Sequence, residues 1–322
     1  MKILVTGAAG FIGTHVTRAL LGRGDEVVGL DNFNDFYDPA IKRKNADSFR
    51  DNPGFRLVEG DIRDKRLVFN IFAEESPQAV IHLAAMAGVR PSLEKPDLYF
   101  DVNVTGTLNM LEGVKKHGKP LLLFASSSSV YGGNKKVPFS EGDDVSYPVS
   151  PYAASKRAGE IMCYTYHHLY ALNVFCLRFF TVYGPGQRPE MAIHKFVRRI
   201  LNHESIPVFG DGSSKRDYTY IDDIMDGVLK ALDRCNGYRI YNLGESNTIT
   251  LSSLIAKIES EIGIKAKIKW LGDQPGDVPA TFADITRSCD ELGYAPSVPI
   301  EEGLKRFYSW YKEEFPTEGI KQ

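Results

Sequence analysis

The chain has 322 residues, which exceeds a typical single domain but suits one α/β domain that carries a smaller lobe. Its 39 basic and 41 acidic residues give a formal net charge of -2. No overall positive field therefore favours nucleic acid or an anionic membrane surface, and any anionic ligand must be bound by local groups.

The cysteines and the apolar runs exclude further classes of protein. Cys163, Cys176, Cys235 and Cys289 are scattered without CxxC or Cys/His spacing, which argues against a disulfide framework and a zinc site. No apolar run approaches the roughly 18 residues that span a bilayer, and the first residues read as a strand rather than as a leader. We expect a cytoplasmic protein without metal or membrane partner.

The first half of the chain alternates short apolar runs with helical periodicity, which is typical of a parallel sheet covered on both faces. We therefore predict a Rossmann-type, doubly wound α/β fold. Helices are predicted near residues 11–21, 65–74, 99–116 and 152–170. Strands are predicted at residues 2–6, 26–30, 55–59, 79–83, 121–125 and 174–177.

After Arg178 the pattern changes to loops rich in glycine and proline between shorter elements. We interpret residues 1–178 as a nucleotide-binding domain and residues 179–322 as a smaller substrate-binding lobe. We expect residues 238–243 to return to the main sheet, so the two lobes are interleaved.

A glycine-rich turn joins the first predicted strand to the first predicted helix. Glycines there permit a tight turn and a close approach of backbone to pyrophosphate, and the helix N-terminus supplies unpaired N–H groups. Taken by itself, such a motif is also compatible with a strand–helix turn that binds no ligand. The predicted contacts are Gly7, Gly10, Phe11, Ile12 and Gly13.

The choice between NAD and NADP rests on Asp31, which follows the second predicted strand. A carboxylate there accepts hydrogen bonds from a ribose 2′-hydroxyl and repels a 2′-phosphate, so we predict NAD. Asn32 brings no compensating charge, and Lys42, Arg43 and Lys44 are expected to be solvated. Further cofactor contacts are predicted at Asp61, Ile62, Leu83, Ala84 and Ala85, with Tyr152 and Lys156 at the nicotinamide end.

Tyr152 and Lys156 lie one helical turn apart on the same helix face. A nearby cation and an oxidised nicotinamide both favour the phenolate, which makes Tyr152 a usable proton acceptor. Ser126–Ser129 follow the fifth strand at the sheet edge where α/β proteins place ligands. Taken alone, a Tyr and a Lys four residues apart are more often a solvated helix face.

The glycine-rich turn, the serine run before Val130-Tyr131-Gly132 and the Tyr152/Lys156 pair together resemble the extended short-chain dehydrogenase/reductase family. The resemblance implies that Ser127 assists Tyr152 and that Ser128 and Ser129 lie beside the reacting sugar carbon. Related dehydratases and decarboxylases carry a carboxyl acid at that place, and this chain has serines. Oxidation followed by re-reduction of the sugar remains as the implied chemistry.

Several strings are similar to the UDP-glucuronate 4-epimerase branch of this family, including residues 31–38, 87–90 and 178–192. The resemblance implies reversible conversion of UDP-glucuronate to UDP-galacturonate through a 4-keto intermediate. Thr181 is implied to meet the carboxylate, and Arg90 and Arg188 suit a carboxylate or a diphosphate, with surface ion pairs as their alternative. Uridine diphosphate contacts are implied at Lys195, Phe209, Arg216, Gln274 and Asp277, and the aspartates of residues 216–223 are expected to cap a helix.

Three other functions stay open: 4-epimerisation of a neutral UDP-hexose or UDP-N-acetylhexosamine, UDP-glucuronate decarboxylation, and a sensor that binds NAD or UDP-sugar without chemistry. The family also implies a homodimer formed through the helices near 99–116 and 152–170. The alternative is that the apolar residues of these helices face the core of the monomer: Leu108, Leu111, Ile161 and Tyr164. Helical periodicity cannot distinguish a dimer interface from a monomer core.

Overall fold

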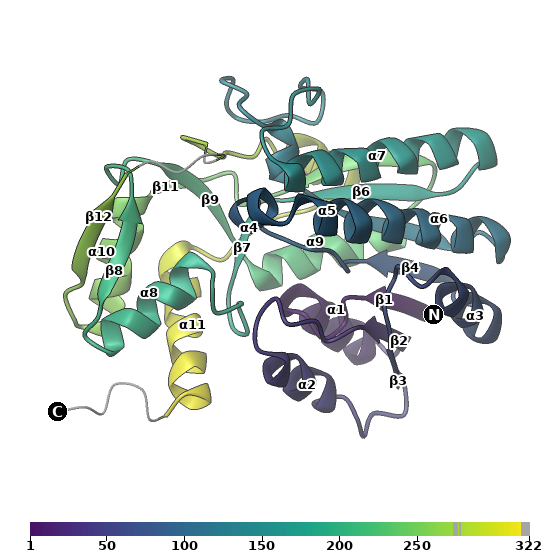
Figure 1. Ribbon diagram of the computed structural model, residues 1–322, viewed down its shortest axis with the longest axis horizontal. Coiled ribbons are helices and arrows are strands. Elements are labelled where there is room, and N and C mark those ends of the chain that lie inside the picture. Colours follow the sequence, from purple (N-terminus) through teal and green to yellow (C-terminus); the bar gives the residue numbers. More distant parts are fainter. Residues whose placement is uncertain (273–275, 277, 317–322) are drawn as a thin grey trace.

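The computed structural model describes residues 1–272, 276 and 278–316, and its centre is a seven-stranded parallel sheet (Figure 1). The strand order is β10-β6-β5-β4-β1-β2-β3. This arrangement confirms the predicted Rossmann-type α/β class. The strands are β1 (Lys2–Thr6), β2 (Glu26–Asp31), β3 (Phe55–Glu59), β4 (Ala79–His82), β5 (Leu121–Ser127), β6 (Val174–Phe179) and β10 (Tyr238–Leu243).

Helices cover both faces of this sheet because its strands are apolar on both sides. On one face α1 (Phe11–Gly22) and α9 (Ile221–Arg234) enclose a core that contains Val16, Leu20 and Val228. On the other face lie α3 (Lys65–Glu75), α6 (Gly106–Lys116) and α7 (Pro151–Tyr170), which pack on a second core (Figure 1). The strand order reverses between β1 and β4, and such a switch point is where doubly wound sheets bind ligands.

The helix predicted over residues 99–116 is interrupted. It consists of α5 (Pro96–Phe100), a π-helical turn η1 (Asp101–Thr105) and α6, preceded by a short α4 (Val89–Glu94). Asn103 in the wide turn explains the break, because its side chain bonds the backbone of Met86 in both directions and donates to Ser155 Oγ at 2.9 Å. The turn thus joins the loop after β4 to helix α7.

Helix α2 (Pro39–Asp47) lies in a stretch that we expected to be solvated. Asp38 caps it by accepting from the Ala40 amide at 2.9 Å, and a proline occupies the first helical position, where its missing N–H costs nothing. The expectation for Lys42 was wrong: its side chain is only 5% exposed, because it turns inward to Asn34.

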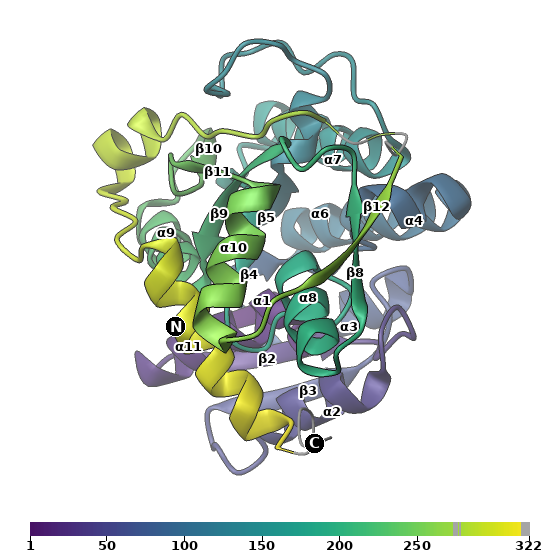
Figure 2. The same ribbon diagram turned by 90° about the vertical axis from the view of Figure 1, so that its left-hand side faces the viewer.

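The smaller lobe stands at the carboxyl edge of the sheet and faces the viewer in Figure 2. It contains a three-stranded sheet, β11-β9-β7, and a parallel pair, β12-β8. Since β10 pairs with β6 in parallel, this part of the chain does return to the main sheet, as predicted. The boundary at 178/179 stays a prediction. The elements are β7 (Thr181–Tyr183), α8 (Ala192–Leu201), β8 (Ser205–Phe209), β9 (Lys215–Tyr220), β11 (Thr248–Thr250), α10 (Leu251–Ile262), β12 (Lys267–Leu271), η3 (Ser288–Leu292) and α11 (Ile300–Glu314).

The aspartates of residues 216–223 do not cap a helix, so that prediction was wrong. Asp217 is fully buried within β9 and accepts hydrogen bonds from the amides of Glu245, Ser246 and Ala283. Asp223, in the first turn of α9, accepts from the amides of Ser297 and Val298 instead. Asp217 thus fastens distant segments to β9, and Asp223 fastens a distant loop to α9.

Over residues 1–272, 276 and 278–316, no helix is both long and apolar enough to cross a membrane. The same residues contain no cluster of three or more His, Cys, Asp or Glu side chains able to hold a metal ion. All four cysteines are free thiols, and three of them are buried.

Candidate active site

A cavity of about 430 Å³ runs along the carboxyl ends of the central strands. It collects side chains from the glycine-rich turn, from the ends of β2 to β5, from the first turns of α7, and from the loop after β6. The sequence-predicted residues that line it are Gly7, Gly10, Phe11, Ile12, Gly13, Asp31, Asn32, Asp61, Ile62, Leu83, Ala84, Ala85, Ser127, Ser128, Ser129, Tyr152, Lys156, Thr181 and Arg188.

The glycine-rich turn requires glycine at two positions. Gly7 has a φ of +70°, and a Cβ there would lie 2.9 Å from the backbone nitrogen of Ala84. A Cβ on Gly13 would lie 2.0 Å from the carbonyl oxygen of Gly7. Gly10 begins α1 without a side-chain cap, so the first amides of the helix face the cavity as a ready anion site. The residues present therefore fit a dinucleotide pyrophosphate.

Asp31 lies buried at the end of β2, where its two carboxylate oxygens are already oriented. One accepts from the Ala9 amide at 3.0 Å and the other from the Phe33 amide at 2.9 Å. Burial raises the pKa of Asp31, whereas these amides and the charge of Lys42 lower it. Each oxygen keeps a second lone pair, which suits a ribose hydroxyl donor.

Lys42 brings a positive charge into the same cavity. Its Nζ donates to the backbone oxygen of Asn34 at 2.8 Å and to Oδ1 of Asn34 at 2.7 Å. Burial lowers the pKa of Lys42, and the carboxylate of Asp31 opposes that change. The ammonium is thus held in place by Asn34 while it offsets part of the charge of Asp31.

Tyr152 and Ser127 meet in the middle of the cavity. Burial raises the pKa of Tyr152, whereas the Ser127 side chain and the charge of Arg188 lower it. Ser127 Oγ donates to Ser129 Oγ at 3.2 Å and accepts from the Ser129 amide at 3.1 Å. The phenol therefore lies near a pair of hydroxyls that are hydrogen-bonded to each other.

Lys156 lies one turn further along α7, and its Nζ donates to the backbone oxygen of Ala125 at 2.8 Å. Burial lowers the pKa of Lys156 to about 8. The bond to β5 places the ammonium in the cavity floor, between the catalytic helix and the fifth strand. Its contact with a nicotinamide ribose stays a prediction.

Thr181, the first residue of β7, and Arg188 line the cavity on the side of the smaller lobe. Arg188 pairs with Glu190 at 2.9 Å, which agrees with the ion-pair alternative, yet its charge also reaches the phenol of Tyr152. A cation and a hydroxyl therefore line the same cavity as the serine run, where they can receive an anionic group.

Four further predicted substrate residues of the described chain are not among those that line the main cavity: Arg90, Lys195, Phe209 and Arg216. The guanidinium of Arg90 stacks 4.2 Å from the ring centre of Phe209. Lys195 is close to this pair, since the charge of Arg90 lowers the pKa of Lys195 after the larger effect of burial. Arg216 lies on β9 and donates to the backbone oxygen of Lys215 at 2.8 Å. Gln274 and Asp277 lie outside the described residues.

Sequence reasoning missed several lining residues: Asn34, Phe36, Tyr37, Lys42 and Met191. All but Met191 belong to the stretch around the start of α2. The Asp38-Pro39 pair, a capping residue followed by proline, is the signal that could have revealed this helix. No local signal shows that its Lys42 turns toward the cofactor cavity, because that depends on where the helix docks.

A glycine-rich turn that fits a pyrophosphate, a buried carboxylate that fits a ribose and a Ser–Tyr–Lys set at one sheet edge are typical of nicotinamide-dependent enzymes of the short-chain dehydrogenase type. Residues 3–244 match the model of the NAD dependent epimerase/dehydratase family. The chain belongs to this family.

Curated relatives and solved structures agree with this assignment. The chain is 47% identical to UDP-glucuronate 4-epimerase 4 of Arabidopsis thaliana, over 97% of this chain and 75% of the relative. It is 46% identical to UDP-glucuronate 4-epimerase of Thermodesulfobacterium geofontis, over 96% of each. Among structures, UDP-glucuronic acid 4-epimerase from Bacillus cereus with UDP-glucuronic acid and NAD superposes with a TM-score of 0.93 at 36% identity, covering 98% of this chain and all of that one.

Proposed function

We propose that this protein is an NAD-dependent 4-epimerase that interconverts UDP-glucuronate and UDP-galacturonate. One observation carries the proposal: Tyr152 and Ser127 line the same cavity as the glycine-rich turn, and Arg188 and Thr181 line it too. The relatives named UDP-glucuronate 4-epimerase, at 46–47% identity, support the same substrate.

Within this proposal, the glycine-rich turn and Asp31 hold the dinucleotide, which would accept a hydride from sugar carbon 4 and later return it. Tyr152 accepts the proton of the 4-hydroxyl, and Ser127 passes it along the hydroxyl chain. The resulting 4-keto sugar turns over in the cavity before it is reduced on its other face, and Tyr152 returns the proton. The cofactor is regenerated in each cycle and need not leave.

The proposed substrate also explains the groups opposite the serines. A 4-keto glucuronate is a β-keto acid, which loses carbon dioxide readily when its carboxylate is perpendicular to the carbonyl plane. Arg188, Thr181, Ser128 and Ser129 can hold that carboxylate in another orientation. Retaining the carboxylate then separates epimerisation from decarboxylation.

The uridine diphosphate is proposed to be bound by a separate set of residues: Arg90, Lys195, Phe209, Arg216, Gln274 and Asp277. An aromatic ring suits uracil and the cations suit the phosphates. A 4-epimerase of a neutral UDP-hexose is the second candidate, since UDP-glucose 4-epimerase from Thermotoga maritima also superposes, with a TM-score of 0.90 at 32% identity over 98% of this chain.

Incubation of the purified protein with UDP-glucuronate, followed by anion-exchange separation of the sugar nucleotides, tests the proposal. We expect UDP-galacturonate to form until the two sugar nucleotides reach equilibrium. Parallel reactions with UDP-glucose and UDP-N-acetylglucosamine test the neutral alternative, and a UDP-pentose product would indicate decarboxylation. Binding without any product would favour the sensor.

A homodimer is proposed through α6 and α7, which lie side by side in Figure 1. Leu108, Ile161 and Tyr164 on these helices are 40%, 52% and 54% exposed, so they do not pack in the monomer core. Leu111 does, since it is fully buried. Large apolar side chains gathered on a helix pair indicate an interface. The four free thiols support a cytoplasmic location, which we also propose.

A further inference from the structure

Helix α7 presents one face to the sheet, with Tyr152, Lys156 and Glu160 four residues apart on it. The helix approaches β5 closely because Gly159 has no side chain: a Cβ there would lie 2.3 Å from Cζ of Phe124. Lys156 fastens one turn of this face to the carbonyl of Ala125. The next turn is fastened by Glu160.

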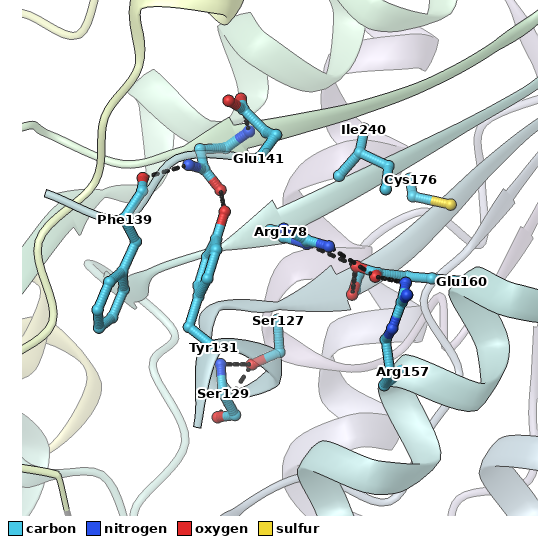
Figure 3. A network of polar contacts seen from close by, with 12 residues as sticks. Ser127, Ser129, Tyr131, Phe139, Glu141, Arg157, Glu160, Cys176, Arg178 and Ile240 are labelled. Carbon is cyan, nitrogen blue, oxygen red and sulfur yellow. Dashed lines mark hydrogen bonds and ion pairs between the residues drawn. The ribbon is translucent and has the colours of Figure 1, made fainter. Parts of the chain in front are cut away.

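The carboxylate of Glu160 is completely buried and accepts four hydrogen bonds. Ser126 Oγ donates to it at 2.6 Å, Arg178 donates through Nε at 2.7 Å and Nη2 at 2.8 Å, and Arg157 donates at 3.1 Å. Figure 3 shows Glu160 between the two arginines. Its pKa is lowered by these partners despite burial, so the group is a carboxylate.

Three elements of the active site meet at this carboxylate. Ser126 on β5 and Arg178 on β6 are direct partners in the register of the parallel sheet, and both reach Glu160 on α7. Ser126 immediately precedes Ser127. Arg178 in turn lies 4.8 Å from the ring centre of Tyr131, whose hydroxyl donates to Asn242 at 2.6 Å. The turn that follows the serine run is therefore held by the same arginine.

A buried ion pair contributes little net stability, because desolvation of both charges offsets their attraction. The four hydrogen bonds of Glu160 instead fix how α7 packs on the sheet. They set the rotation of the helix about its axis and its distance from the end of β5. A displacement of about 1 Å between Ser127 and Tyr152 is enough to cost roughly 100-fold in rate.

We propose that Glu160, with Arg178 and Ser126, is a positioning residue for the reaction and keeps Ser127, at the end of β5, and Tyr152, on α7, at their places in the cavity. It touches neither substrate nor cofactor; it acts through the end of β5 and through α7. This inference rests on the proposed function, in which Ser127 and Tyr152 carry the proton.

The test compares two variants that each lose one buried hydroxyl. Ser126→Ala removes the link between the serine run and Glu160. Tyr294→Phe is the matched control, because it removes a buried bond to the Gly244 carbonyl in the smaller lobe, away from α7. With UDP-glucuronate we expect kcat to fall about 10-fold in Ser126→Ala, with KM and bound NAD within about twofold of wild type. Tyr294→Phe should stay within about twofold of wild type.

The pH profile separates positioning from a general loss of folded protein. The Ser127 side chain lowers the pKa of Tyr152, so a displaced Ser127 should move the rise of kcat to higher pH in Ser126→Ala. Unfolding would scale the whole profile down without moving it. Glu160→Gln should move the profile in the same direction if it folds; if it does not, Ser126→Ala decides.

Equal kcat values and unmoved profiles in Ser126→Ala and Tyr294→Phe would overturn the positioning role. Wild-type activity is measured first, and its absence on every UDP-sugar would overturn the proposed function instead. The two failures are therefore distinguishable.

Discussion

Ser127, at the end of β5, and Tyr152, in the first turn of α7, line the same cavity, and the Ser127 side chain lowers the pKa of the Tyr152 phenol. The fold thus brings together two segments that are separate in the chain. Burial raises the pKa of Tyr152, so the proposed role of this phenol as proton acceptor depends on Ser127 and on nearby positive charge to favour the phenolate.

Replacing Tyr152 by Phe should lower turnover about 1,000-fold while leaving bound NAD unchanged, because only the proton acceptor is lost. The measurements are epimerisation rate and NAD content of the purified protein. Tyr166→Phe is the control, since it removes a hydroxyl that bonds Glu112 at the other end of the same helix. Near-normal activity in Tyr152→Phe would remove this residue from the mechanism.

Ser127→Ala should be milder, with a loss of about 10-fold, because Ser129 or a water can take over part of the relay. The rise of kcat with pH should also move to higher pH, since the side chain that lowers the pKa of Tyr152 is gone. A larger loss in Ser128→Ala than in Ser127→Ala would show that the neighbouring serine is the relay.

Asp31 should make the protein prefer NAD over NADP. A 2′-phosphate beside this buried carboxylate meets repulsion and lost hydrogen bonds, together about 2–4 kcal/mol, or roughly 30- to 1,000-fold in affinity. Lys42 reduces this effect only in part, because Asn34 holds its ammonium. Titration of the apo-protein with both cofactors measures the ratio.

In the same titration, Asp31→Ala should bring the two affinities closer together. Asp35→Ala, an exposed carboxylate in the same loop, should leave the ratio unchanged. Equal affinities of the wild type for NAD and NADP would mean that Asp31 does not distinguish the ribose hydroxyl from its phosphate.

The mass of the protein in solution at micromolar concentration should be that of a dimer. Ile161→Arg should convert it to a monomer, because a charged side chain would be buried without a partner at the α6/α7 face. Tyr147→Arg changes a side chain that is 81% exposed elsewhere and should remain dimeric. A monomeric wild type contradicts the proposed interface.

Glu245 should make stability depend on pH. Burial raises its pKa to about 7, with smaller contributions from Asp223 and Asp217. Because the folded state holds this proton more tightly than the unfolded chain, the stability it contributes is full below the usual value of 4.5 and is lost as pH rises to about 7.

Glu245→Gln should therefore raise Tm by about 1–3 °C at pH 8 and change it little at pH 4.5, as measured by thermal melts. Glu204→Gln, on an exposed side chain, serves as control and should show no such difference. A uniform shift at both pH values would exclude titration of Glu245 as the cause.

The sequence alone predicted the features that are encoded by residues close together in the chain. The strands of the main sheet, the glycine-rich turn and the Tyr152/Lys156 pair are each encoded within a few residues, because apolar periodicity and fixed offsets reflect local backbone geometry. The return of residues 238–243 to the sheet was also expected, and β10 pairs in parallel with β6.

Only the tertiary structure decided which distant groups meet. Lys42 was expected in solvent and lies beside Asp31; Asp217 was expected at a helix end and gathers three amides inside β9. Glu160 finds Arg178 and Ser126 through the strand register of β5 and β6. A polar side chain carries no local mark of its partner, because the partner is set by how helices dock on the sheet, and burial then makes each such pairing obligatory.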